Sequence, residues 1–251
     1  MLVDNPAGNF QFLKGIGPFS SGVIARSGYE IVHAAFHPLP PLQRGFELIE
    51  RHLQGSQRPL NALCGMELRI PQSLSRQAFN AFNQPYINKL AGWNLLVDGL
   101  NPVARTNVAP VINPVSEPSV YGFSYTVPAQ YEGVTFVVSG LPEIQLREDG
   151  AYEIISHGDT STAGLRKKAE HVLQGLTARL QGLQVTWDDV TAVEVYTVHD
   201  LHPLLATTIL PALRGANRHG IRWHYARPPV VEIECELDVR GVRQEIILPG
   251  G

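Results

Sequence analysis

Two apolar stretches at matching places in the two halves of the chain decide the fold: Ala62-Leu63-Cys64-Gly65-Met66-Glu67-Leu68-Arg69-Ile70-Pro71 and Thr191-Ala192-Val193-Glu194-Val195-Tyr196-Thr197-Val198. Each has the composition and apolar spacing of a β-strand. Each is followed by a segment with the apolar spacing of a helix, 73–90 in the first half and 201–213 in the second. The two strands begin about 129 residues apart, so the sequence predicts two copies of one unit.

The segments around these stretches follow the same order in both halves. The first half predicts alternating strands and helices, followed by extended segments, at 29–33, 42–53, 62–71, 73–90, 105–111 and 120–127. The second half predicts the same alternation at 134–138, 160–180, 188–199, 201–213 and 230–237. The last stretch, Val230–Leu237, alternates strictly between apolar and polar residues and is the clearest strand in the sequence.

This order predicts an α+β fold made of two tandem units, residues 1–128 and 133–251. The joint falls between Pro128 and Gly133, where proline, glycine and polar residues interrupt the pattern. The alternative is one continuous α/β domain. It is less favoured because the sequence contains no glycine-rich phosphate loop.

Composition limits the classes of function. The chain has 251 residues, of which 44% are hydrophobic and 17% charged, with a net charge of −3. No basic excess favours nucleic acid or an anionic membrane as a partner, and no apolar run reaches the ~18–20 residues of a membrane span. The first residues lack the pattern of a secretory signal. Two cysteines, Cys64 and Cys235, cannot form a disulfide framework, so we expect a cytoplasmic protein.

Short motifs in both halves carry a family resemblance. The first half contains Gly17-Pro18-Phe19-Ser20, the helix pattern Phe79-Asn80-Ala81-Phe82-Asn83-Gln84-Pro85-Tyr86, and Pro102-Val103-Ala104-Arg105-Thr106. The second half contains Phe136-Val137-Val138-Ser139-Gly140, Trp187-Asp188-Asp189-Val190 and Val231-Glu232-Ile233-Glu234. In this order and spacing, both halves resemble the YjgF/RidA family. The resemblance implies that each unit has the chorismate-mutase-like fold, a β-sheet packed on two helices.

The two halves depart from the family pattern in complementary ways. The first half has Val120-Tyr121-Gly122-Phe123 where V-E-I-E is expected, and the second half lacks the G-P-Y-S opening. One half thus keeps the family arginine and the other keeps the glutamate. We expect a site shared between the two copies.

The family resemblance implies hydrolysis of reactive enamines or imines that carry a carboxylate, with neither a metal nor an organic cofactor. It assigns Arg105 to the substrate carboxylate, which a planar guanidinium binds in a bidentate manner. It assigns water activation and proton transfer to Glu232 or Glu234, and it lines the site with Phe19, in place of a family tyrosine, and with Ser139 and Gly140. Arg227 is a second candidate for the carboxylate.

Less specific interpretations of the same residues stay open at this point. Arg105 could form a structural ion pair, and Glu232, Glu234 and Glu236 could form an ordinary solvated strand face. The nine histidines lack a metal-binding spacing, so no metal site is expected. Cys64 and Cys235 are expected in the core. Four arginines near the C-terminus form a basic cluster, for which an anionic metabolite is favoured over RNA; they are Arg214, Arg218, Arg222 and Arg227.

Three functions compete. The first is a RidA-like deaminase that converts a carboxylated enamine or imine to a keto product and ammonia. The second is a chorismatase-like enzyme, because chorismatases also resemble duplicated YjgF units. The third is a non-catalytic protein that binds a small carboxylated metabolite. Family units bury one sheet face in a trimer, so the resemblance also implies a homotrimer.

Overall fold

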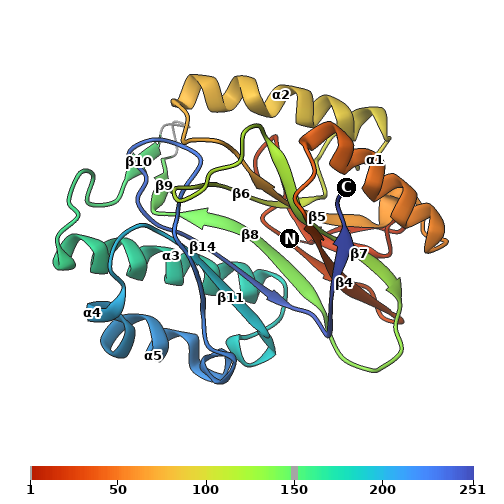
Figure 1. Ribbon diagram of the computed structural model, residues 1–251. Coiled ribbons are helices and arrows are strands. Elements are labelled where there is room, and N and C mark those ends of the chain that lie inside the picture. The colour runs from red at the N-terminus through yellow and green to blue at the C-terminus, as the bar shows by residue number, and fades with distance from the viewer. Residues whose placement is uncertain (1, 148–151) are drawn as a thin grey trace.

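The computed structural model describes residues 2–147 and 152–251 (Figure 1). The first group of strands comprises β4 (Tyr29–His37), β5 (Leu63–Arg69), β6 (Ala104–Pro110), β7 (Ser119–Pro128), β13 (Ala226–Arg227) and β15 (Gln244–Pro249). The second group comprises β1 (Leu2–Asn5), β2 (Phe10–Leu13), β3 (Gly22–Ala25), β8 (Phe136–Pro142), β11 (Ala192–Tyr196), β12 (Arg222–His224) and β14 (Glu236–Gly241). A small hairpin joins β9 (Ile144–Leu146) and β10 (Tyr152–Ile154).

The helices are α1 (Leu42–Gly55), α2 (Arg76–Gly92), α3 (Thr162–Gly182), α4 (His202–Leu204) and α5 (Leu210–Leu213). Figure 1 shows α1 and α2 on one side of the molecule and α3 to α5 on the opposite side. Two mixed sheets, each covered by its own helices, confirm the predicted α+β class.

The two sheets repeat one topology. The first sheet contains the strand order β6-β5-β7-β4, and the second contains β12-β11-β14-β8. In both, the first pair is parallel and the next two pairs are antiparallel. The connections also match, because α1 lies between β4 and β5 while α3 lies between β8 and β11, after the β9–β10 pair. In the same way, α2 follows β5 and the α4–α5 segment follows β11. This repetition agrees with the two copies that the sequence predicts.

The ends of the chain cross between the two sheets. The hairpin strands β1, β2 and β3 extend the second sheet, because β3 pairs with β8. The C-terminal strand β15 extends the first sheet by pairing in parallel with β4. The predicted joint at 128–133 lies between β7 and β8, but each sheet also takes a piece of the other half. Residue boundaries for two separate units stay a prediction.

The helices show where local sequence signals succeed and fail. Ser75 and Ser161 cap α2 and α3 through their hydroxyl oxygens, and α2 carries Pro85 within it. The helix predicted over 201–213 is confirmed as one continuous helical run, 202–213, although its middle part, Leu205–Ile209, is π-helical and joins α4 to α5. Prolines at 203 and 211 remove two backbone donors from this region.

The strand predicted over Val230–Leu237 is wrong for its first six residues. β14 begins only at Glu236, and Glu232 lies in a turn with a positive φ of 73°. The amides of Glu234 and Cys235 donate to the buried carboxylate of Glu143 instead of to a neighbouring strand, at 2.6 and 3.0 Å. A side chain from far along the chain therefore replaces the strand partner that the alternation suggested.

Charged side chains fill the space between the two sheets. Arg240 on β14 contacts Glu194 on β11 at 2.7 Å, Glu245 on β15 at 3.0 Å and Glu67 on β5 at 3.4 Å. Thr106 on β6 donates to Asp238 on β14 at 2.7 Å. The sheet faces that were expected to meet in a trimer are thus covered within one chain, and the homotrimer stays a prediction. No helix in the described ranges is long and apolar enough to cross a membrane.

Candidate active site

Arg105 on β6 is a buried guanidinium without an acidic partner among the described residues. The residue is 3% exposed. Its Nη2 donates to Asn83 Oδ1 at 2.8 Å, while its Nη1 is buried and has no hydrogen-bond partner within the described part of the chain. Burial lowers the pKa of Arg105 to about 10. A buried cation normally needs a compensating anion, so this arrangement suits an anionic ligand and speaks against the structural ion pair.

One face of α2 and one loop enclose this guanidinium. Phe79, Asn83 and Tyr86 stand at helical spacing, so all three reach the same side of α2. The Cζ atom of Arg105 lies 4.8 Å from the ring centroid of Tyr86 and 5.7 Å from that of Phe79. The ring of Phe19, from the loop before β3, lies 5.0 Å away. These rings bind the cation through their π faces and separate it from water.

Ser139 and Gly140 bring the second unit to the site. The backbone N–H of Arg105 donates to Ser139 Oγ at 2.9 Å, and the Ser139 hydroxyl donates to the carbonyl of Ser20 at 2.5 Å. The N–H of Gly140 donates to Thr106 Oγ1 at 3.0 Å. The structure therefore brings Arg105, Phe19, Ser139 and Gly140 together, at the contact between β6 of one unit and β8 of the other.

Glu236, at the start of β14, is an acidic group at this site, and Asp238, which accepts a hydrogen bond from Thr106, is another. Glu236 is 4% exposed, and a Cβ atom on Gly140 would meet its Oε1. Burial raises the pKa of Glu236 to about 8, helped by the charges of Asp238 and Glu143 and opposed by those of Arg105 and Arg179. A carboxyl group with such a pKa can both donate and accept a proton near neutral pH.

Arg179 on α3 is a second cation that sequence reasoning missed. Its Nη1 donates to the carbonyl of Ser139 at 2.8 Å. Burial lowers the pKa of Arg179 to about 10, with Glu236 acting in the opposite direction. One signal was present in the sequence, because Arg179 stands three residues after the buried Leu176, within the apolar face of the helix.

The other predicted site residues lie apart from this arrangement. The Glu232 side chain is 62% exposed and stands 3.3 Å from His157. Glu234 contacts His199 at 2.7 Å and Arg227 at 3.0 Å. Arg227 pairs with Ala109 on β6, four residues, or about 13 Å of strand, from Arg105. Within the described ranges, no ion pair or hydrogen bond links these three residues to Arg105 or Glu236. The predicted single face for the three glutamates is wrong because 231–235 do not form a strand.

The repeat allows the candidate site residues to be compared with the equivalent positions in the other copy. With the offset of about 129 residues, Glu67 on β5 corresponds to Tyr196 on β11. Glu67 lies opposite Thr106 and Gly122, whereas Tyr196 lies opposite His224 and Glu236. Trp223 therefore occupies the second copy's counterpart of Arg105, and Gly122 the first copy's counterpart of Glu236. The two copies differ in a complementary way at these positions, but the glutamate concerned is Glu236 and not the predicted Glu232 or Glu234.

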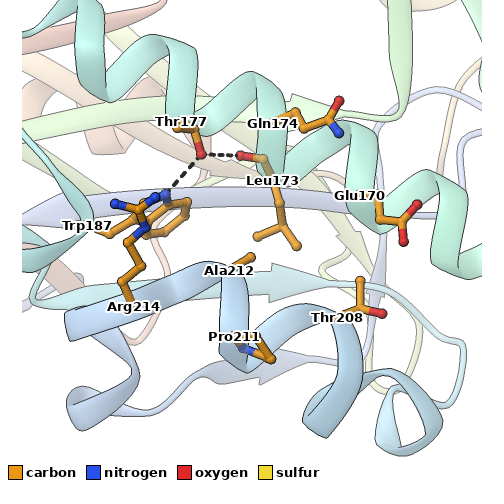
Figure 2. A pocket seen from close by; sticks show the side chains of 9 residues that line it. All are labelled: Glu170, Leu173, Gln174, Thr177, Trp187, Thr208, Pro211, Ala212 and Arg214. Carbon is orange, nitrogen blue, oxygen red and sulfur yellow. Dashed lines mark hydrogen bonds between the residues drawn. The ribbon is translucent and has the colours of Figure 1, made fainter.

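A cavity of about 320 Å³ lies between α3 and the α4–α5 region (Figure 2). In it, Thr177 accepts a hydrogen bond from the Trp187 indole and donates to the carbonyl of Leu173. The cavity contains neither Arg105 nor Glu236. Arg214, at its rim in Figure 2, belongs to the basic cluster predicted near the C-terminus. That cluster is partly neutralised, since Arg222 contacts Glu194 and Glu245 while Arg227 contacts Glu234.

The cysteines and histidines offer no alternative centre. Cys64 and Cys235 are buried in the core, as expected, and burial raises the pKa of both thiols. Among the residues that the structure describes, no group of three His, Cys, Asp or Glu side chains is placed to hold a metal ion.

Comparison with known proteins places the sequence in a family. Residues 2–246 match the family model described as 2-aminomuconate deaminase CnbZ. A 2-amino-5-chloromuconate deaminase from Comamonas testosteroni is 36% identical over 250 residues, which cover 96% of each chain. Both findings confirm the expected deaminase, a hydrolase acting on C–N bonds.

Solved structures show more distant similarity. A chorismatase structure covers 88% of this chain and 77% of its own, with 11% identity and a TM-score of 0.47. A Rid-family protein of unknown function from Yersinia pestis covers 47% of this chain and 84% of its own, with 18% identity and a TM-score of 0.32. The family model and the deaminase relative both extend over nearly the whole sequence, and the chain therefore belongs to the 2-aminomuconate deaminase CnbZ family.

Proposed function

We propose that this chain hydrolyses 2-aminomuconate, or a close derivative, at the site formed by Arg105, Ser139, Gly140 and Glu236. The observation that carries the proposal is the buried Arg105 guanidinium, which has no acidic partner in the described residues. 2-Aminomuconate is an enamine whose amino group stands beside one carboxylate, with a second carboxylate at the far end of a conjugated chain. The deaminase relative, named for a chlorinated 2-aminomuconate, supports this substrate class.

Substrate binding depends on Arg105. The carboxylate next to the amino-bearing carbon binds the guanidinium, whose free Nη1 and partly engaged Nη2 offer a planar pair of donors. Asn83 and the rings of Phe19, Phe79 and Tyr86 hold the guanidinium in place. Binding a carboxylate here restores the charge balance that burial of Arg105 disturbs.

Glu236 moves the protons in the proposed reaction. Its protonated form gives a proton to a carbon of the enamine and produces an iminium ion. The resulting carboxylate takes a proton from water as the water oxygen bonds to the iminium carbon. Glu236 then protonates the nitrogen, the C–N bond breaks, and ammonia leaves. The same carboxylate recovers the last proton from the new carbonyl oxygen, so enamine and water yield a keto acid and ammonia, and the acid is regenerated.

A pair of glutamate variants tests this assignment. Glu236→Gln keeps the shape of the side chain and removes its titration, so we expect kcat on 2-aminomuconate to fall by about 10²–10⁴-fold. Glu232→Gln is the matched control, because its exposed side chain lies outside the site; its kcat should stay within about twofold of the natural protein. Ammonia release and loss of the conjugated absorbance measure both. Equal activity of Glu236→Gln and the natural protein would refute the role of Glu236.

Assembly and location remain predictions of the sequence. We propose a cytoplasmic homotrimer on the basis of cysteine usage and the family resemblance. Sedimentation velocity on the purified full chain tests the trimer directly, and a monomeric or dimeric mass would reject it.

A further inference from the structure

Arg179 brings a second guanidinium to the candidate site from a different unit and a different layer. It projects from the last turns of α3, and its Nη1 contacts the carbonyls of Ser139 and Gly140 at 2.8 and 3.5 Å. It is only partly buried. Within the described residues no carboxylate lies within 4.0 Å of it. Its contacts with carbonyl oxygens fix the head group but leave its charge uncompensated.

Arg179 and Arg105 meet the same short segment of β8. The backbone N–H of Arg105 donates to the side chain of Ser139, and the Arg179 guanidinium donates to the backbone of Ser139. Both guanidinium charges also act to lower the pKa of Glu236. Two cations from two units therefore serve one protonatable carboxyl group, which is more positive charge than a single substrate carboxylate requires.

Two other buried cations differ in this respect. Lys168 contacts Glu143, and Arg240 contacts Glu194. Each of these contacts neutralises a charge inside the chain and leaves no net attraction for a ligand. The positive charge of Arg179 stays available to attract an anionic ligand, and the partial exposure of this residue lets the ligand approach.

We propose that Arg179 binds the second carboxylate of the substrate and makes the enzyme selective for dicarboxylic over monocarboxylic enamines. The inference rests on the proposed function, in which Arg105 binds the first carboxylate. In this arrangement the conjugated chain lies along Ser139 and Gly140, with Glu236 beside the amino-bearing carbon. A residue on a helix of one unit thus selects a substrate whose reacting end is held by the other unit.

Two unreactive ligands of equal chain length separate the two carboxylate sites. Muconate carries a carboxylate at each end of a six-carbon diene, and sorbate carries one. Isothermal titration of the full chain should show tighter binding of muconate than of sorbate. In Arg179→Gln, muconate affinity should fall by about 10- to 100-fold, the usual range for one charge-assisted contact, while sorbate affinity should change by less than about twofold.

Controls make the outcome decisive. Arg166→Gln removes an exposed arginine from the same helix and should leave both affinities unchanged, whereas Arg179→Lys should keep part of the muconate preference. If Arg179→Gln weakens muconate and sorbate equally, or weakens neither, the proposal is wrong. Failure of the proposed function is distinct, because the natural protein would then not turn over 2-aminomuconate, or Arg105→Gln would leave turnover intact.

Discussion

A Cβ atom placed on Gly140 would lie 1.9 Å from Oε1 of Glu236. Gly140 is on β8 and Glu236 on β14, two strands that pair antiparallel, and the Glu236 carboxyl occupies the space that a side chain at position 140 would need. The same absent atom would lie 3.2 Å from the Thr106 methyl group. The glycine thus gives the Glu236 carboxyl its place between the two units.

Replacing Gly140 with alanine should displace the Glu236 carboxyl. We expect kcat/KM on 2-aminomuconate to fall by about 10- to 100-fold, because small displacements of a reacting group reduce rates by such factors. Gly55→Ala is the control, since a Cβ there meets no atom within 4 Å. Steady-state kinetics measure both variants. Full activity in Gly140→Ala would mean that the position of Glu236 does not matter for turnover.

The raised pKa of Glu236 predicts the alkaline side of the pH profile. Because the proposed first step needs the protonated carboxyl, kcat/KM should fall above pH about 8, the pKa of this group. The negative charge of Asp238 contributes to that raised pKa, so Asp238→Asn should move the fall to lower pH. A pH–rate profile for both proteins tests this. An unchanged profile in Asp238→Asn would show that another group controls the alkaline limb.

The raised pKa of Glu236 also makes the stability of the folded chain depend on pH. The folded chain keeps the Glu236 proton up to pH about 8, whereas the unfolded chain releases it near 4.5. The free energy of unfolding therefore loses a contribution as pH rises through this window. Glu236→Gln removes that loss, so its melting temperature relative to the natural protein should increase from pH 5 to pH 8. Thermal scans across this range measure the difference, and a constant difference would contradict a raised pKa.

The repeat could be predicted because it depends on local periodicity. The strand at Ala62 and its counterpart at Thr191 show their pattern within a few residues. Arg105 could also be predicted, since its motif survives in the first half. The pairing of β3 with β8 and of β15 with β4 could not be predicted, because each pair joins segments that are distant in the sequence.

Glu236, the acidic residue of the proposed site, was missed for a related reason. Alternation continues unbroken through Val230–Leu237, and nothing local shows that pairing starts only at Glu236. The cause is Glu143, whose carboxylate binds the amides of Glu234 and Cys235 from 91 and 92 residues away. In the structure Glu236 is buried, whereas Glu232 is exposed and Glu234 is partly exposed. The sequence pattern does not show this difference.

An acidic side chain at position 83 should block the carboxylate site from within the chain. The Oδ1 of Asn83 accepts from Arg105 at 2.8 Å, so Asn83→Asp places a permanent anion against the guanidinium. We expect KM for 2-aminomuconate to increase by more than about tenfold, and more than in Asn83→Ala, because the new carboxylate competes with the substrate. Steady-state KM values for the two variants decide this. A larger effect in Asn83→Ala would mean that orientation of Arg105 matters more than its charge.

Because the two units differ at the positions of Arg105 and Glu236, we expect each chain to bind one ligand. Trp223 stands where the second copy would need an arginine, and Gly122 stands where the first copy would need a glutamate. Neither of these two positions therefore supplies a cation for the carboxylate or an acid for the proton. Titration of the full chain with muconate should therefore saturate at one equivalent, and Arg105→Gln should abolish saturation in the same concentration range. Two equivalents of similar affinity would show that the second arrangement also binds the dicarboxylate.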